Sequence, residues 1–519
     1  MIFLSMSNYS AESILCLLYR MSFKNDVIIQ QLPSCNSLTL KDLRIDSGII
    51  RTVQNYSNGF IEHSIVCDNG LFRNVSAMKD CLDSLINEDL PKYILARKSV
   101  HKYDKIGSAC FNNRAAIKLV ELDKYFKLIE IENDDKLFYF ADICSAPGGF
   151  SEYIYYKLGY ETKGFGFSIK DPAIPFRIQD FNLKTSPDNF TITYGKDGTG
   201  DIYSQANIKF LTSLIKKDTH KAMCNLVTGD GGFSTENDWN RQEILTKRLI
   251  LCEFITALCL LKKGGHFTTK VFDTVTTVTA DLYYIMSYFF KEVYICRPLQ
   301  SRSMNSEKFI ICKNFIIRSN HKVIVNYLFD VNQRLADLGF TMTEKTPSGD
   351  VYSIYDNVNR NSDFVDALTK VNNIILSKQL QSLTQMRHNF YNIDKIKKED
   401  RIGISKKVLK SFGIPFRLDS YYSSLKKMSQ EQQIATLLKN VKDKSIAIIS
   451  LFGKIYCVKN NVTKQISGVV IPSGTVLIGT EESNGKLRVS DVCMITWLKQ
   501  GFDKERVIRF IKSYNSKIV

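Results

Sequence analysis

The 519-residue sequence lacks any apolar run long enough to cross a bilayer. Its longest apolar stretch, Leu249 to Leu261, lies between two pairs of basic residues and is shorter than the roughly 20 residues that a spanning helix needs. We therefore expect a buried core helix there, and no membrane association. The first 19 residues contain no basic residue ahead of their apolar stretch, which argues against a secretory signal peptide.

The sequence also lacks a Cys-x-x-Cys pair, and its 13 cysteines are scattered and odd in number. This pattern is typical of reduced thiols and not of a disulfide framework. The 6 histidines are dispersed, and only His63 with Cys67 and His220 with Cys224 approach the spacing of metal ligands. Two separate pairs do not make a four-ligand zinc site, so we expect no metal.

Positive charge is what the chain has in excess. Lys and Arg number 70 against 53 Asp and Glu, a net charge of +17, and such a surface attracts polyanions such as nucleic acid. The excess is uneven, because residues 401–519 hold 21 Lys and Arg against 8 Asp and Glu, a net of +13. With 44% apolar and 24% charged residues, the composition is globular and excludes a disordered or collagen-like chain.

Strand and helix patterns alternate from residue 136 onward. We expect a strand over Lys136–Cys144, the turn Ser145-Ala-Pro-Gly-Gly149, and then a helix that ends at Gly159. Further strands are expected over Lys163–Ile169, Met223–Thr228 and His266–Phe272, with a long helix over about Asn240–Leu261. Repeated βα units predict a mainly parallel sheet with helices on both faces.

The next two expected strands, Glu292–Arg297 and Lys308–Phe315, are joined by a short connection. A parallel crossover usually needs a dozen or more residues, so these strands should be antiparallel neighbours. A parallel α/β sheet finished by one reversed strand resembles the class I S-adenosylmethionine-dependent methyltransferase fold (Rossmann-like) more than a dinucleotide dehydrogenase.

The last part of the chain reads as a helix followed by a small basic module. The helix is expected over about Ser362–Arg387, before the charged run Lys395–Lys407. The module, 401–519, should be α/β or β-rich. Its expected elements are strands over Ser445–Leu451, Lys454–Val458, Ser467–Ile471 and Val476–Gly479, and a final helix over Lys504–Ser513.

The glycine turn after the first strand is a candidate ligand site. Glycines let the backbone approach a ligand, and the following helix offers free N–H groups. The turn does not fit Gly-x-Gly-x-x-Gly, but Pro-Gly-Gly suits the amino-acid end of S-adenosylmethionine. Taken alone, it could equally be an ordinary strand-to-helix turn.

Seven motifs occur in one order along the chain. They are Asn113-Arg-Ala-Ala-Ile-Lys118, Phe140-Ala-Asp-Ile-Cys-Ser-Ala-Pro-Gly-Gly-Phe-Ser-Glu-Tyr153, Lys163-Gly-Phe-Gly166, Gly200-Asp-Ile202, Asp230-Gly-Gly-Phe-Ser234, Gly264-Gly-His-Phe-Thr-Thr-Lys-Val-Phe-Asp273 and Ser301-Arg-Ser-Met-Asn-Ser-Glu307. Over about Arg97 to Leu335 they closely resemble the animal-type mRNA cap-1 2′-O-ribose methyltransferases of the RrmJ/FtsJ superfamily. The resemblance implies methyl transfer from S-adenosylmethionine to the first transcribed nucleotide of capped mRNA.

The resemblance implies a catalytic tetrad of Lys118, Asp230, Lys270 and Glu307. A ribose hydroxyl is a weak acid, so a lysine base needs a lowered pKa. We expect Lys270 to be the base, Lys118 to lower its pKa, and the two carboxylates to orient the lysines. Taken singly, Lys118 or Glu307 reads as a solvated charge, whereas Lys270 interrupts an apolar strand where a lysine is costly to bury.

The resemblance also implies cofactor and RNA contacts. The cofactor residues are Cys144, Ser145, Ala146, Pro147, Gly148, Gly149, Phe150, Asp201 and Ile202, and the capped-RNA residues are Lys79, Asp83, Arg97, Asn240 and Asn305. Where the family stacks an aromatic residue on the methylated guanine, this chain has Leu82, so either cap affinity is weaker or another aromatic residue substitutes. An exposed helix is the alternative for the segment Lys79 to Asp83.

Four regions follow from these patterns: an N-terminal extension with a cap-contacting segment (1–95), the methyltransferase core (96–335), a partly helical connector (336–400) and the basic module (401–519). Through Phe412-Gly-Ile-Pro415 and its strand pattern, the module faintly resembles a guanylyltransferase-like domain, and the lack of a Lys-x-Asp-Gly motif implies an inactive one. We expect it to bind RNA or the transcription or capping machinery.

Two alternatives stay open: an RrmJ-like enzyme for internal rRNA sites, and a non-catalytic RNA-binding factor. We expect an intracellular protein, with nucleus, cytoplasm, viral origin and oligomeric state left open.

Overall fold

The fold is described from a computed structural model of the full chain. The described residues are 26–38, 40–49, 64–107, 109–111, 113–131, 137–144, 146–158, 162–170, 190–232, 239–341, 347–356, 361–396, 399–414, 446–451, 454–459, 462–466, 475–483 and 486–494. Several features predicted from the sequence lie outside them, among them His63, Ser145, Gly159, the motif residues Phe233 and Ser234, the strand Ser467–Ile471 and the helix Lys504–Ser513.

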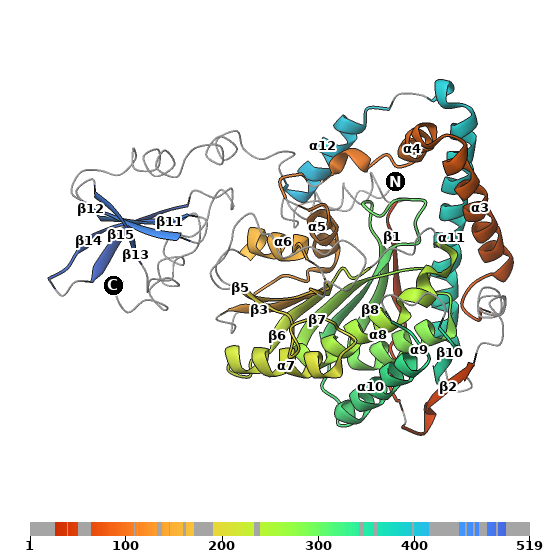
Figure 1. Ribbon diagram of the computed structural model, residues 1–519, viewed down its shortest axis with the longest axis horizontal. Coiled ribbons are helices and arrows are strands. Elements are labelled where there is room, and N and C mark those ends of the chain that lie inside the picture. Colours follow the sequence, from red (N-terminus) through yellow and green to blue (C-terminus); the bar gives the residue numbers. More distant parts are fainter. Residues whose placement is uncertain are drawn as a thin grey trace, which may run out of the picture.

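An eight-stranded sheet forms the centre of the molecule, in the order β1-β8-β9-β7-β6-β3-β4-β5 (Figure 1). The strands are β1 (Ile28–Leu32), β3 (Phe138–Ile143), β4 (Thr162–Phe167), β5 (Phe190–Thr193), β6 (Cys224–Gly229), β7 (Leu261–Val271), β8 (Phe290–Arg297) and β9 (Lys308–Phe315). Strands β3 to β7 pair in parallel, and β9 runs antiparallel to both β7 and β8. The predicted mainly parallel sheet and its reversed strand are therefore confirmed.

Three strands of this sheet, β1, β5 and β7, differ from the prediction. Strand β5 was not predicted. Strand β1 pairs antiparallel with β8 at the edge of the sheet and was not predicted, because it is short and its interior residues include Gln30 and Gln31. Strand β7 begins at Leu261 instead of His266, directly after the helix that precedes it. Its pairing with β6 is irregular between Cys224 and Leu226, so the glycine pair lies within the strand and does not start it.

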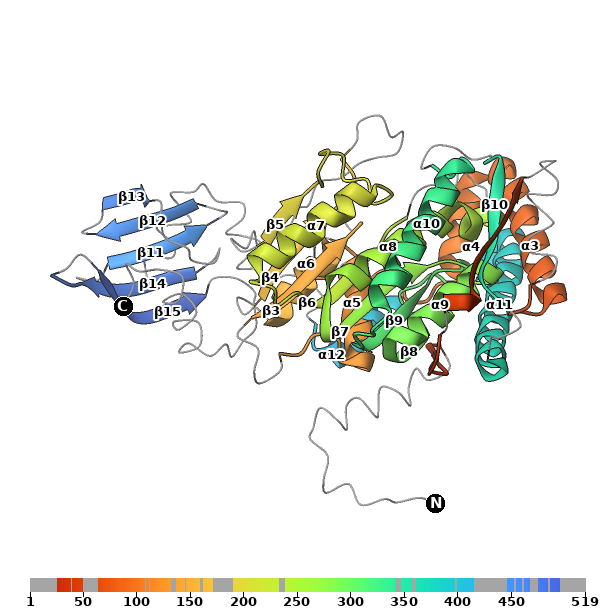
Figure 2. The ribbon, with the colours of Figure 1, turned by 90° about the horizontal axis from the view of Figure 1, so that it is seen from below.

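Helices cover both faces of the sheet and enclose two separate hydrophobic cores. On one face lie α5 (Ala115–Phe126), α6 (Gly149–Leu158) and α12 (Arg401–Phe412). The other face, turned toward the viewer in Figure 2, carries α7 (Gln205–Asp218), α8 (Gln242–Leu260), α9 (Thr277–Phe289) and α10 (His321–Asp337). Strand β3 serves both cores, because Phe138 and Phe140 enter the first and Ala141 and Ile143 enter the second.

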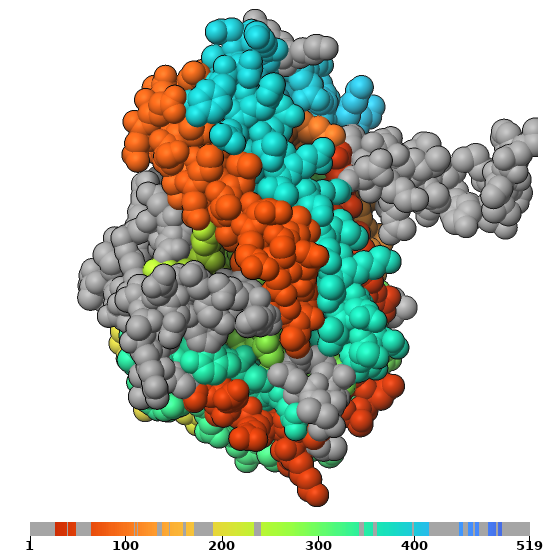
Figure 3. Space-filling view, turned by 90° about the vertical axis from the view of Figure 1, so that its right-hand side faces the viewer, coloured from red at the N-terminus to blue at the C-terminus, as the bar shows by residue number. Residues whose placement is uncertain are grey.

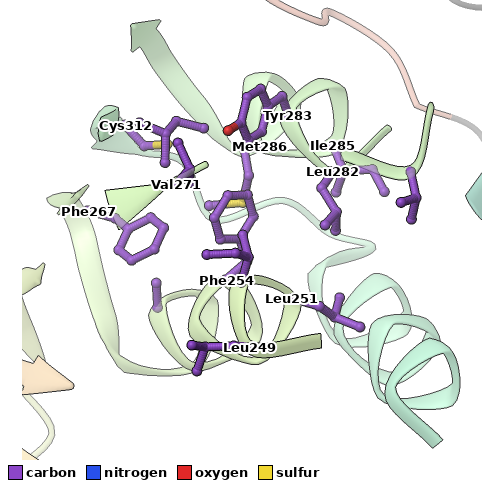
Figure 4. Packing of buried hydrophobic residues seen from close by; sticks show 14 of the residues in the cluster. Leu249, Leu251, Phe254, Phe267, Val271, Leu282, Tyr283, Ile285, Met286 and Cys312 are labelled. Atoms are coloured by element: carbon purple, nitrogen blue, oxygen red, sulfur yellow. The ribbon is translucent and has the colours of Figure 1, made fainter. Parts of the chain in front are cut away.

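Helix α8 is the buried helix that the apolar stretch predicted. Its Phe254 meets Phe267 of β7 edge-to-face, with ring centroids 5.4 Å apart, and stacks on Tyr283 of α9 at 6.1 Å (Figure 4). All three rings are inaccessible to solvent. Truncating one such aromatic residue to alanine typically costs about 3–5 kcal/mol, so this packing fixes α8 under the sheet. In the part of the chain that the structure describes, no helix is long and apolar enough to span a bilayer.

The predicted extension and connector pack together. Helices α3 (Asn69–Glu88) and α4 (Leu90–Ser99) lie along α11 (Ser362–Tyr391), as Figure 3 shows with α3 and α4 in orange and α11 in cyan. Helix α11 is the predicted helix, extended by one turn. Two further strands, β2 (Leu43–Ile49) and β10 (Gly349–Tyr355), form a separate antiparallel pair. The first helix of segment 401–519, α12, packs on the main body through Val408 and Leu409.

The basic module contains a five-stranded antiparallel sheet in the order β13-β12-β11-β14-β15. Its strands are β11 (Ile446–Leu451), β12 (Lys454–Lys459), β13 (Val462–Ile466), β14 (Thr475–Glu481) and β15 (Leu487–Met494). Three of the predicted strands, which correspond to β11, β12 and β14, are confirmed, whereas β13 and β15 were not predicted. The sheet has its own small core of Ala447, Ile449, Tyr456, Val458 and Val476.

Candidate active site and RNA-binding cavity

Strand register places two of the predicted tetrad residues side by side. In the parallel pair β6–β7, Gly229 lies opposite Thr269, so the next residues, Asp230 and Lys270, are neighbours at the carboxyl ends of their strands. The Lys270 Nζ atom lies 3.1 Å from Asp230 Oδ1 and donates a hydrogen bond to the Asp230 carbonyl oxygen at 2.9 Å. Both side chains are more than four-fifths buried. Open α/β sheets bind their ligands at this edge.

The other two tetrad residues form a second ion pair. Lys118 on α5 donates from Nζ to Oε2 of Glu307 at 2.8 Å, and Ser301 donates to Oε1 at 2.7 Å. Burial alone would raise the pKa of Glu307, but the charges of Lys118 and Lys270 outweigh it and lower the pKa to about 2. Because both lysines act on Glu307, the two ion pairs form one cluster.

The prediction that the pKa of Lys270 is lowered is wrong for the free protein. Burial lowers the pKa of Lys270, but the charges of Asp230 and Glu307 outweigh burial, and the pKa is raised. The positive charge of Lys118 was expected to lower the pKa of Lys270, but Lys118 is itself paired with Glu307. Lys270 is therefore a protonated lysine at neutral pH in the free protein.

The predicted cofactor turn is fixed by a buried carboxylate. Asp142 Oδ2 accepts from the backbone N–H and hydroxyl of Ser151, at 3.0 and 2.6 Å, and Oδ1 accepts from the Thr228 hydroxyl at 2.7 Å. These bonds join the end of β3 to the first turn of α6 and to β6. They hold the described part of the turn, Cys144 and Ala146 to Phe150, at the N-terminus of α6, where backbone N–H groups can receive a carboxylate.

The second predicted cofactor segment follows a glycine that no other residue could replace. Gly200 has φ +71°, and a Cβ atom there would lie 1.9 Å from the Ser168 carbonyl oxygen. Next to it, the Asp201 carboxylate accepts from the Tyr203 N–H at 2.8 Å and is partly exposed, whereas Ile202 is packed in the core. After burial, the charges of Glu253 and Asp201 help to raise the pKa of Cys144, so the two cofactor segments lie near each other. The Asp201 carboxylate can therefore bind the polar groups of a nucleoside, while the glycine turn before α6 can bind an amino-acid carboxylate.

A cavity of about 150 Å³ lies between α3, α4, α11 and the segment before β9, and its lining includes Ser306, the residue before Glu307. It is lined by four of the five residues predicted to contact capped RNA: Lys79, Asp83, Arg97 and Asn305. The fifth, Asn240, is not among the lining residues, and its side chain donates to Asp80 Oδ1 at 2.6 Å. The wall on the α11 side is held by Gln379, which donates to the Met304 carbonyl oxygen at 2.9 Å.

Residues 111–315 match the family model of the FtsJ-like methyltransferases. The chain is 32% identical over 364 residues to cap-specific mRNA (nucleoside-2′-O-)-methyltransferase 1 of Drosophila melanogaster, and 31% identical over 366 residues to the protein of that name from Homo sapiens. These alignments cover 68% and 67% of this chain but 45% and 42% of the relatives. The chain thus spans less than half the length of these relatives.

Among solved structures, a ribosomal RNA methyltransferase from Plasmodium falciparum aligns with 40% of this chain and 99% of its own, with a TM-score of 0.30 and 21% identity. The FtsJ-like match itself contains all four tetrad residues and both cofactor segments. Lys79, Asp83 and Arg97 precede the matched range, so the cavity joins the FtsJ-like domain to the helices before it.

Sequence reasoning missed several residues that line this cavity. Tyr93 brings an aromatic ring to the cavity, with the Arg97 guanidinium carbon 5.9 Å from its centroid, whereas Leu82 is 3% exposed. Burial, followed by the charge of Arg114, lowers the pKa of His101 to about 4, so this lining histidine is neutral, and its Nε2 has no hydrogen-bond partner among the described residues. Arg302 belongs to a motif noted in the sequence, but no pattern distinguished Tyr93 or His101.

Within the described residues, no group of three or more His, Cys, Asp or Glu side chains could hold a metal ion.

Proposed function

We propose that this chain transfers a methyl group from S-adenosylmethionine to the ribose 2′-hydroxyl of the first transcribed nucleotide of capped mRNA. The observation that carries the proposal is a cluster of two lysine–carboxylate pairs together with a basic cavity whose lining ends at Ser306, the residue before Glu307. The printed names of the curated relatives give this activity for those proteins. The paired charges favour a catalyst over a passive RNA-binding platform, which has no need of two lysines held close together.

The cofactor would lie against the described part of Cys144 to Phe150 and against Asp201. S-adenosylmethionine supplies the methyl group on its sulfonium sulfur. The Asp201 carboxylate can accept hydrogen bonds from the ribose or adenine of a nucleoside, and the N-terminus of α6 can receive a carboxylate. Asp142 would not touch the cofactor, because both of its oxygens are used to hold the turn.

Lys270 would take the proton from the 2′-hydroxyl. Because Lys270 is protonated in the free protein, only its neutral fraction can act as a base, and that fraction increases with pH. Asp230 holds the Lys270 amine through a 3.1 Å contact, and Glu307 holds the Lys118 amine, which would donate to the hydroxyl oxygen. The carboxylates thus fix where the two amines point, but they reduce the fraction of Lys270 that is unprotonated at neutral pH.

The cavity fits a charged, flat ligand such as a capped 5′ end. Lys79, Arg97 and Arg302 supply cations for the bridging phosphates, and Arg can bind a phosphate through two parallel hydrogen bonds. Asp83 can accept from the N–H groups of guanine, and the Tyr93 ring offers a stacking surface that Leu82, buried in the core, does not. The basic module with its own sheet would hold RNA further along, or a protein of the capping machinery.

The test measures methyl transfer to three RNAs of the same sequence, with a methylated-guanosine cap, an unmethylated guanosine cap or a 5′ triphosphate. We expect the highest kcat/KM on a capped RNA, with the methyl group on the first nucleotide after nuclease digestion and mass spectrometry. Equal activity on all three would overturn cap dependence. Methylation only at internal positions would favour the rRNA-type enzyme, and RNA binding without transfer to any of the three would favour the non-catalytic factor.

A further inference from the structure

A fifth ionisable group, Glu253 of α8, lies directly beneath the tetrad. It is inaccessible to solvent, and its Oε2 accepts a hydrogen bond from the Thr269 hydroxyl at 2.5 Å. Thr269 immediately precedes Lys270 on β7. This contact therefore ties α8 to the backbone that presents the proposed base.

The other carboxyl oxygen of Glu253 faces the turn that carries Asp230. A Cβ atom on Gly229 would come within 3.0 Å of Oε1, and one on Gly231 within 2.4 Å, so both residues flanking Asp230 are glycines where Glu253 approaches. Oε1 itself is buried, and a backbone hydrogen bond from Gly231 acts on the carboxyl group of Glu253. Glu253 thus contacts both strand ends whose side chains make up the Lys270–Asp230 pair.

Burial is the main reason that the pKa of Glu253 is raised to about 8, with a contribution from the Asp230 charge, while the Thr269 hydrogen bond and the Lys270 charge oppose it. The other ionisable groups near Glu253 are the Cys144 thiol after β3 and the neighbouring Cys252. At neutral pH the side chain is thus an uncharged acid. If it loses its proton, it becomes a third carboxylate acting on Lys270 and raises the pKa of Lys270 further.

We propose that Glu253 is a positioning residue for methyl transfer, which in its uncharged form holds the Asp230 turn against β7 and whose ionisation slows the reaction. This inference rests on the proposed function, because it assigns Lys270 the role of base. An uncharged acid and an amide have nearly the same shape, so glutamine at this position should preserve the contact with Thr269 and remove only the ionisation.

The test compares Glu253→Gln with the wild-type chain in single-turnover methyl transfer between pH 6 and pH 9. We expect equal rates at pH 6 to 7 and a rate about tenfold higher for the variant at pH 9, where roughly nine-tenths of a group with a pKa near 8 has ionised. A variant-to-wild-type ratio that stays constant with pH would overturn the proposal. So would a glutamine variant that folds but is inactive at every pH.

Glu121→Gln is the matched control. Glu121 is equally buried, burial raises its pKa to about 8 as well, and it accepts from the Leu299 N–H at 2.9 Å on the opposite face of the sheet. We expect the ratio of its rate to the wild-type rate to stay constant between pH 6 and pH 9, because Glu253 and not Glu121 contributes to the pKa of Lys270.

A readout without RNA separates this inference from the proposed function. Titration of the Lys270 side chain by NMR of lysine-labelled protein should give a lower pKa in Glu253→Gln than in the wild type. An unchanged Lys270 titration would overturn the inference. If the titration shifts but no RNA is methylated by either protein, the proposed function fails while the coupling of Glu253 to Lys270 stands.

Discussion

The Nζ atom of Lys118 lies 2.8 Å from Oε2 of Glu307, although 189 residues separate them in the sequence. The contact joins α5 to the segment that leads into β9. A second contact, from the Leu299 N–H to Glu121 one turn further along α5, holds the same segment at 2.9 Å. The position of Glu307 therefore depends on how α5 packs, and the tetrad combines one helix residue with residues at strand ends.

Lys270→Ala should abolish methyl transfer while capped RNA still binds. The side chain contributes the proposed proton acceptor, but the cavity residues that would hold the cap come from α3, α4 and the segment before β9. Lys270→Arg should also be inactive, because a guanidinium does not lose its proton near neutral pH. Transfer is measured with labelled methyl donor, and RNA binding by fluorescence anisotropy.

Lys263→Ala is the control for this pair of variants. Lys263 lies on the same strand, β7, but it is exposed and at the other end. We expect wild-type transfer from it. Near-normal activity of Lys270→Ala would contradict the assignment of Lys270 as the base.

The rate of the methyl-transfer step should increase with pH from pH 6.5 upward. The neighbouring carboxylates raise the pKa of Lys270, so its neutral fraction is small at neutral pH and grows about tenfold per pH unit below that pKa. Above about pH 8 the increase should become less steep, because Glu253 ionises there. Single-turnover rates at saturating RNA measure this step. A rate that is constant between pH 6.5 and pH 8 would contradict a lysine base.

Glu307→Gln should lower the free energy of unfolding at neutral pH. The free energy of unfolding of the variant should also change less than that of the wild type as the pH is lowered. The lysines outweigh burial and lower the pKa of folded Glu307 from 4.5 to about 2, so its stabilising effect is complete above about pH 4.5 and is lost as the pH falls toward 2. That shift corresponds to about 3 kcal/mol. Urea unfolding at pH 7 and pH 3 should show a clearly larger difference between wild type and variant at pH 7. An equal difference at both values would contradict the ionised pair.

Much of the fold was predictable because the central strands are buried on both faces and read as apolar runs between glycine turns. Asp230 and Lys270 were named from the resemblance, and the pairing of β6 with β7 explains why they are neighbours. Strand β1 was not predictable, because its burial is set by pairing with β8 and its sequence is half polar.

The charge state of the site could not be predicted from residue types. Two lysines suggested mutual lowering of pKa, but the outcome depends on which carboxylate contacts which amine, and that is a property of the packed structure. The role of Glu253 was hidden in the same way, because one acidic residue in an apolar helix gives no sign of facing Gly231 and Thr269. Likewise, Tyr93 lies in a polar segment, and only the packing of α4 against α11 brings its ring to the cavity.

Tyr93→Ala should raise KM for capped RNA without changing kcat/KM for RNA that carries only a triphosphate. Stacking of a base on an aromatic ring contributes about 1–3 kcal/mol, which corresponds to a rise of roughly 5- to 150-fold. Tyr93→Phe keeps the ring and should keep most of the affinity. Leu82→Ala is the contrasting variant: Leu82 is 3% exposed, so its truncation should lower stability by about 2–5 kcal/mol in urea unfolding. If Tyr93→Ala binds capped RNA as tightly as the wild type while the protein remains folded, the guanine does not stack on this ring.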